Sequence, residues 1–118
     1  MMANAHRPAV TTMRDWKWSP AEKAIARRAF DLALGRELEV VVRETKERAA
    51  RIRKASELWD LERWLGERRQ RIDRTFDYRY SVLPQVFAGL LRDGHIREDD
   101  LDGLASDKLD VIRSLAGS

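Results

Sequence analysis

The sequence predicts an all-α fold, in which a long N-terminal helix precedes a helical head. Apolar residues recur at spacings of three and four along most of the 118 residues, as on one face of an α-helix. No proline interrupts the chain between Pro20 and Pro84. No segment alternates apolar and polar residues as a strand would. Charged residues make up 36% of the chain, a content typical of helices with long solvated faces.

Length and composition limit the domain organisation and the cellular setting. A chain of 118 residues fits one domain with a modest core. We expect a flexible N-terminal arm over residues 1–18 and a single all-helical domain over residues 19–118. The chain has no cysteine, no apolar leader and no run long enough to cross a membrane. The expected protein is therefore cytoplasmic and does not bind membranes.

The arm ends in two tryptophans, and the long helix follows at once. Trp16 and Trp18 are expected to pack back on the domain, because exposed indoles are costly. Ser19 and Glu22 form a capping-box sequence around Pro20, which suits a first helical position. The pattern continues to Lys54, so the helix spans about residues 19–54. At 1.5 Å per residue it is roughly 50 Å long, and part of it must project from the domain.

The projecting half of this helix carries a seam with heptad spacing, which predicts a homodimer. The seam residues are Leu38, Val42, Thr45, Ala49 and Ile52. Small residues at positions 45 and 49 allow another helix to come close. Pairs spaced by four, such as Glu44 with Arg48, are expected to stabilise the helix itself. The chain's own second helix could cover one such seam, but it is too short to cover the whole helix.

A second helix is expected from a cap at Ser56 to about Phe76, and two of its faces have a distinctive composition. Its apolar band contains a single charged residue, Arg68. The band consists of Leu58, Leu61, Leu65 and Ile72. A second stripe lies about 120° away and has the composition of a protein-docking surface. The candidate partner-binding residues in this stripe are Trp59, Glu62, Arg63, Gly66, Arg69 and Asp73.

Two residues of the stripe favour docking over a plain surface role. Gly66 costs roughly 1 kcal/mol in a helix interior, yet its missing side chain lets another backbone come close. The planar guanidinium of Arg69 can donate two parallel hydrogen bonds to a partner carboxylate. The alternative is that the stripe belongs to the dimer or to an intramolecular interface, and the pattern leaves both open.

Two or three further helices complete the predicted head. Val82 to Leu91 is strongly apolar, and Pro84 either lies in the first turn of this helix or kinks a longer one. Asp93 and Gly94 end it with a C-cap glycine. The apolar spacing from Leu101 to Leu115 indicates one last helix or two short ones.

The sequence contains no motif for an enzyme, a metal site or a cofactor. Its two histidines, His6 and His95, are far apart, and no cysteine joins them. Phosphate-binding glycine loops are missing. His95 follows Gly94 and is expected to be a hydrogen-bond donor at the C-cap of the helix rather than a catalyst.

Nucleic-acid binding is an alternative function, because arginines are dense between residues 63 and 79. Acidic residues alternate with them, whereas a phosphate-binding face would be uniformly basic. Nucleic acid is therefore an unlikely partner. A small helical nucleic-acid-associated protein, or a general protein-interaction module with a different partner, is the second interpretation.

Several motifs resemble the fluorescence recovery protein family. They include Leu58-Trp59-x-Leu61, Arg69-x-x-Ile72-Asp73, Ser81-Val82 and Leu104-Ala105-x-Asp107-Lys108. The resemblance implies an all-α protein with a helical head that forms an antiparallel homodimer. It also implies a non-enzymatic regulator that binds an orange carotenoid protein and promotes its return to the inactive state.

Carried over residue by residue, the family's functional tryptophan matches Trp59 and its critical arginine matches Arg69. The family's docking helix usually reads Trp-x-Leu-His-Asp-Phe-Leu. In this chain, Glu62 stands at the histidine position and Arg63 at the aspartate position, which reverses a charge. The resemblance therefore predicts a divergent member whose partner surface differs near Arg63.

Overall fold

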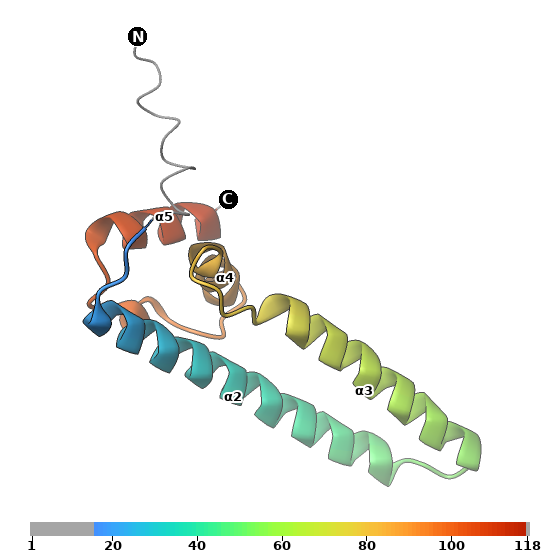
Figure 1. Ribbon diagram of the computed structural model, residues 1–118. Coiled ribbons are helices and arrows are strands. Elements are labelled where there is room, and N and C mark those ends of the chain that lie inside the picture. The colour runs from blue at the N-terminus through green and yellow to red at the C-terminus, as the bar shows by residue number, and fades with distance from the viewer. Residues whose placement is uncertain (1–15, 118) are drawn as a thin grey trace.

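A computed structural model describes residues 16–117, and this part of the chain is helical, without strands. The order of elements is α2 (Pro20–Ala50), α3 (Ala55–Thr75), α4 (Leu83–Arg92), the short 3-10 helix η2 (Glu98–Leu101) and α5 (Ser106–Gly117). The molecule is elongated, with extents of 68 × 28 × 22 Å. In Figure 1, α2 and α3 form a projecting hairpin, and α4 and α5 lie at its base. The prediction of an all-α fold is confirmed.

The long helix begins where its capping sequence predicts. The Glu22 backbone N–H donates to the Ser19 hydroxyl at 3.1 Å, and the Ser19 N–H donates to the Glu22 carboxylate at 3.0 Å. Pro20 occupies the first helical position. The helix ends at Ala50 rather than near Lys54, because the chain turns there to start α3. The predicted 19–54 helix is therefore too long by about one turn at its C-terminal end.

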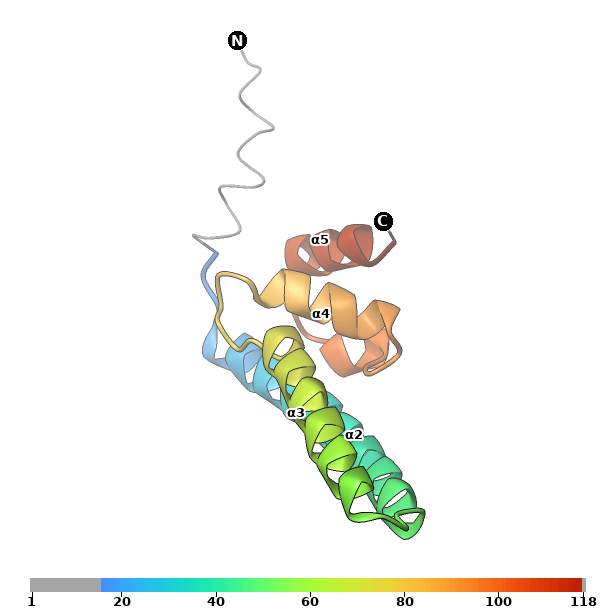
Figure 2. The ribbon, with the colours of Figure 1, turned by 90° about the vertical axis from the view of Figure 1, so that its right-hand side faces the viewer.

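The head is built on the first half of α2. Three alanines (Ala26, Ala29 and Ala33) are almost completely buried and let other elements approach α2 closely. The remaining core consists of Trp18 before α2, Phe30 from α2, Leu83, Phe87, Ala88 and Leu90 from α4, and Ile96, Leu101, Leu104 and Ile112 from the C-terminal segment. Figure 2, turned by 90°, shows α4 and α5 lying together beside the base of the hairpin. One end of the molecule thus holds the core.

The two tryptophans before α2 pack on this head, as predicted. Trp18 is 8% exposed, and its ring lies 5.5 Å from that of Tyr80. Trp16 is half-buried against the core, and the Lys108 ammonium lies 5.5 Å from its ring centre. The rest of the predicted arm, residues 1–15, lies outside the described residues.

The start of α3 corrects the sequence prediction. The helix begins at Ala55, and Lys54 rather than Ser56 is its N-cap residue. The Glu57 carboxylate accepts the backbone N–H groups of Arg53 at 2.7 Å and Lys54 at 2.9 Å. These bonds lower the pKa of Glu57 and satisfy two backbone donors at the start of the helix.

The ends of the head helices settle the two alternatives left by the sequence. Pro84 lies in the first turn of α4 and does not kink a longer helix. Gly94 follows the C-cap Asp93 with φ of 80°, the left-handed conformation that favours glycine. The C-terminal segment forms two short helices, η2 and α5, separated by Gly103 at φ 103°.

Candidate protein-docking surface

The α2–α3 hairpin is held together largely by charged and aromatic side chains. The Arg68 guanidinium lies 3.4 Å from the Glu37 carboxylate and 2.8 Å from that of Glu44. Trp64 is flanked by Arg48 and Arg68, whose guanidinium carbons lie 4.3 and 5.5 Å from its ring centre. The predicted Glu44–Arg48 pair is wrong, because Glu44 pairs across the hairpin and Arg48 stacks on Trp64 instead.

An apolar groove of about 380 Å³ runs along the hairpin. Its walls are Leu34, Leu38, Val41, Leu65 and Ile72, with Arg68, Arg69 and Asp73 at the charged edge. Leu38 belongs to the predicted dimer seam, whereas Arg69 and Asp73 belong to the predicted docking stripe. The two predicted surfaces therefore meet at one groove.

A second apolar hollow, of about 360 Å³, lies on α3 nearer the hairpin end. It is lined by Leu58, Trp59, Leu61, Glu62 and Leu65. Leu65 lines both hollows, so they form a continuous surface on α3. Trp59 is 59% exposed and Leu58 48%, which is unusual for side chains of this size. We call this continuous surface, with the six candidate residues of the stripe, the α3 docking surface.

The remaining candidate residues of the stripe are exposed on α3. Arg63 lies 3.1 Å from Asp60 within the helix, and both side chains are 65% exposed, so this pair adds little stability. A Cβ added at Gly66 would meet no described atom within 4 Å. The fold of the described chain therefore does not require this glycine. Arg69 forms no ion pair with any residue in the part of the chain that the structure describes.

The predicted dimer seam is open along α2. Leu38 is 45% exposed and Val42 52%, and Ala49 is also exposed. Thr45 is half-buried, and its hydroxyl donates to the Val41 carbonyl at 2.6 Å. The helix α3 packs against a neighbouring stripe of α2, which contains Leu34, Glu37, Val41, Glu44 and Arg48. Four of the five seam residues thus lie on α2 outside its main contact with α3.

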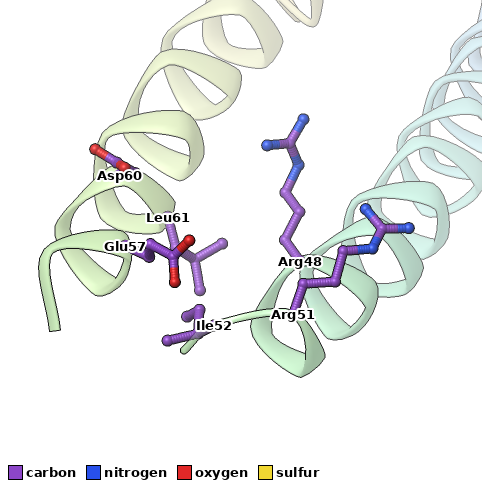
Figure 3. A pocket seen from close by; sticks show the side chains of 6 residues that line it. All are labelled: Arg48, Arg51, Ile52, Glu57, Asp60 and Leu61. Carbon is purple, nitrogen blue, oxygen red and sulfur yellow. The ribbon is translucent and has the colours of Figure 1, made fainter. Parts of the chain in front are cut away.

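Ile52 differs from the rest of the predicted seam. It lies beyond the end of α2 and lines a hollow at the hairpin end together with Leu61 (Figure 3). Arg48 from the end of α2, its C-cap Arg51, and Glu57 and Asp60 from α3 also line this hollow. The bases lie at the C-terminus of one helix and the acids at the N-terminus of the other, where each complements the helix dipole. The charged residues around the hollow are therefore explained by the two helix ends, without a ligand.

The sequence interpretation missed the residues that hold the hairpin. Leu34 and Val41 line the groove, and Glu37 and Glu44 accept Arg68. The available signal was Arg68 itself, a lone charge in an apolar band. Glu37 and Glu44, spaced by seven on the preceding helix, were its possible partners.

The described residues hold no cluster of the kind that binds a metal. Among residues 16–117, no three His, Cys, Asp or Glu side chains gather as metal ligands would. The His95 backbone N–H donates to the Leu90 carbonyl at 2.8 Å at the end of α4, and its ring nitrogen lies 3.8 Å from Glu37. None of the described helices is both long enough and apolar enough to cross a bilayer.

The all-helical head carries a projecting hairpin with an exposed apolar and arginine-bearing surface, an arrangement typical of helical protein-interaction modules. Residues 18–116 match the sequence model of a protein family, the photoprotection regulator fluorescence recovery protein. The chain belongs to this family of photoprotection regulators.

Individual relatives agree with this assignment. The fluorescence recovery protein of Synechocystis sp. PCC 6803 is 37% identical over 99 residues, which cover 84% of this chain and 91% of that protein. The structure of the Fremyella diplosiphon fluorescence recovery protein is 37% identical, with a TM-score of 0.80. The Synechocystis structure is 36% identical with the same TM-score. Each alignment to these two structures covers 86% of this chain and the whole of the solved one.

Proposed function

We propose that this protein is a dimeric, non-enzymatic regulator that binds an orange carotenoid protein and promotes its return to the inactive state. The observation that carries the proposal is the family match over residues 18–116, combined with the α3 docking surface. That surface is apolar and leaves Trp59 and Arg69 accessible, the two residues that correspond to the functional pair of the family.

The regulator acts by differential binding. A protein that speeds a partner's relaxation without changing a covalent bond must bind the relaxing or final state better than the activated state. Trp59 supplies a large apolar anchor and Arg69 a planar donor, two side chains that often dominate interface energies. Glu62, Gly66 and Asp73 complete the contact. No cofactor or metal is needed for this mechanism.

The homodimer is proposed to form antiparallel through Leu38, Val42, Thr45 and Ala49, with Ile52 at the edge. The support is that two large apolar side chains on α2 are half-exposed, beside a groove that the chain's own α3 leaves open. A second copy seated there would bury both features. The predicted docking residues Arg69 and Asp73 line the same groove, so docking and dimerisation are expected to influence each other.

Arg63 is proposed to alter the choice of partner. It stands where the family usually carries an aspartate, and its neighbour Asp60 only partly offsets its charge because both side chains are largely exposed. A partner surface with a cation at this point would be repelled, whereas one with a carboxylate would be favoured.

The test follows the dark recovery of a photoactivated orange carotenoid protein with and without this protein. Acceleration at micromolar concentration supports the proposal, and its absence removes that carotenoid protein as a partner. The Arg63→Asp variant is expected to increase the acceleration for a partner adapted to other family members. Arg71→Asp, at an exposed position of the same helix outside the stripe, is the matched control and should leave the rate unchanged.

A further inference from the structure

Arg68 is the one charge in the apolar band of α3, and neither docking nor dimerisation explains it. Its side chain is 14% exposed. The Nε atom lies 3.4 Å from the Glu37 carboxylate and an Nη atom 2.8 Å from the Glu44 carboxylate. Glu37 and Glu44 are two turns apart on α2, a rise of about 10 Å. One guanidinium therefore bridges two levels of the neighbouring helix.

Few other contacts fix α3 along α2. Within α3, all of whose residues are described, no side chain is fully buried. The interface also contains the open groove rather than a filled core. Apolar contacts of this kind tolerate sliding, since they have no direction. Charged hydrogen bonds do not tolerate sliding, because they require a narrow range of distances and angles.

A shift of α3 by one turn would be penalised at Arg68. Such a shift would bring Trp64 or Ile72 to the level of the two glutamates. It would also leave Glu37, whose side chain is 15% exposed, without its cation. A largely shielded carboxylate that loses its guanidinium partner is destabilised, so the shifted arrangement is disfavoured. The contact of Arg48 on α2 with the face of Trp64 would be lost as well.

We propose that Arg68 is a positioning residue, which sets the register and rotation of α3 on α2 and so orients the α3 docking surface. Arg69 follows it in the chain and is rotated by about 100° around the helix axis. Fixing Arg68 inside the hairpin thus holds Arg69 at the edge of the groove. The effect on partner binding rests on the proposed function, whereas the register itself can be measured without any partner.

The register is tested by spin-label distances. The chain has no cysteine, so Glu47→Cys on α2 and Gln70→Cys on α3, both at exposed positions, provide the two labels. An excess of unlabelled protein removes distances between copies. We expect a narrow distribution for the otherwise unchanged chain and a broadened or shifted one for Arg68→Met. Arg71→Gln, at an exposed arginine of the same helix, is the matched control and should keep the narrow distribution.

Two further variants separate positioning from a general loss of structure. Arg68→Lys keeps the charge but cannot bridge both glutamates, so it should give an intermediate distribution. In a Glu37→Gln/Glu44→Gln background, Arg68→Met should broaden the distribution much less than in the unchanged chain. An unchanged distribution for Arg68→Met, or the same broadening in both backgrounds, would overturn the proposal.

Partner binding gives the second readout. Arg68→Met is expected to weaken binding of the orange carotenoid protein on the order of tenfold, with partial rescue by Arg68→Lys. Equal affinities for Arg68→Met and the unchanged protein would contradict the positioning role. If the unchanged protein itself does not bind, the proposed function fails, while the distance measurement still decides whether Arg68 sets the register.

Discussion

The Lys108 ammonium lies 3.1 Å from both carboxylate oxygens of Glu22, although 86 positions separate the two residues. Both side chains are buried, and the ammonium also donates to the Lys17 carbonyl at 2.9 Å. The second Glu22 oxygen accepts the Ala105 backbone N–H at 2.8 Å. This pair therefore ties the start of α2 and the segment before it to α5.

Breaking the Glu22–Lys108 pair is expected to destabilise the head strongly. Glu22→Gln or Lys108→Met each leaves one buried charge without its partner, a change that costs about 3–5 kcal/mol. The double variant should lose less than the sum of the two single variants, since no charge is left behind. Chemical denaturation measures the free energy of unfolding of all three. Additive losses would mean that the two residues act independently.

The same pair predicts a loss of stability in acid. Burial alone would raise the pKa of Glu22, but hydrogen bonds from Ala105 and Ser19, together with Lys108, hold the pKa below its usual 4.5. Because the folded pKa is lower than the unfolded one, the stabilisation is complete above the unfolded value. It is lost as pH falls through the folded value. Unfolding free energies between pH 7 and pH 2 should fall less steeply in Glu22→Gln.

Local patterns in the sequence predicted the start and end of the head helices well. The capping box around Ser19 and the glycine at position 94 act through neighbouring residues, so short sequence motifs are sufficient to identify them. The N-cap of α3 was misplaced by two residues, at Ser56 instead of Lys54. The Glu57 carboxylate reaches back to the N–H groups of Arg53 and Lys54, and the helix begins before Ser56.

The hairpin interface could not be predicted from periodicity. The stripe of α2 that contacts α3 contains Glu37, Glu44 and Arg48, which resemble a solvated face in sequence. Their contacts depend on Arg68 and Trp64 of another helix, and no local signal pairs them. The stripe on α3 was singled out because Trp59 and Gly66 are unusual residues for a solvated helix face, and its docking role stays a prediction.

Tyr78 should ionise only at strongly alkaline pH. Burial first, and then the neighbouring Tyr80, raise the pKa of Tyr78 to about 12. Its hydroxyl has no hydrogen-bond partner among the described residues, so Tyr78→Phe should be neutral or slightly stabilising at pH 7. Since the folded pKa exceeds the unfolded value near 10, Tyr78 reduces stability as pH rises from about 10 to 12. Absorbance titration should lose its latest phenol step in Tyr78→Phe, and an unchanged curve would contradict this assignment.

Val42→Glu is expected to dissociate the proposed dimer. A carboxylate placed in an apolar contact between two α2 helices costs several kcal/mol, which weakens association on the order of a hundredfold or more. Light scattering across a concentration series gives the mass directly. Leu32→Glu is the control, because Leu32 is also exposed on α2 but lies outside the predicted seam. A monomer mass for the unchanged protein, or a dimer mass for Val42→Glu, would argue against this interface.

Gly66→Ala should separate folding from docking. An added Cβ meets no described atom within 4 Å, so the variant should gain about 0.5–1 kcal/mol of stability through better helix propensity. Gly35→Ala is the matched control, since Gly35 lies inside α2 with equally open surroundings. Both variants should unfold at higher denaturant concentration. Gly66→Ala alone should weaken binding of the orange carotenoid protein, because the partner's backbone then meets a methyl group. Equal binding by the two variants would place Gly66 outside the contact.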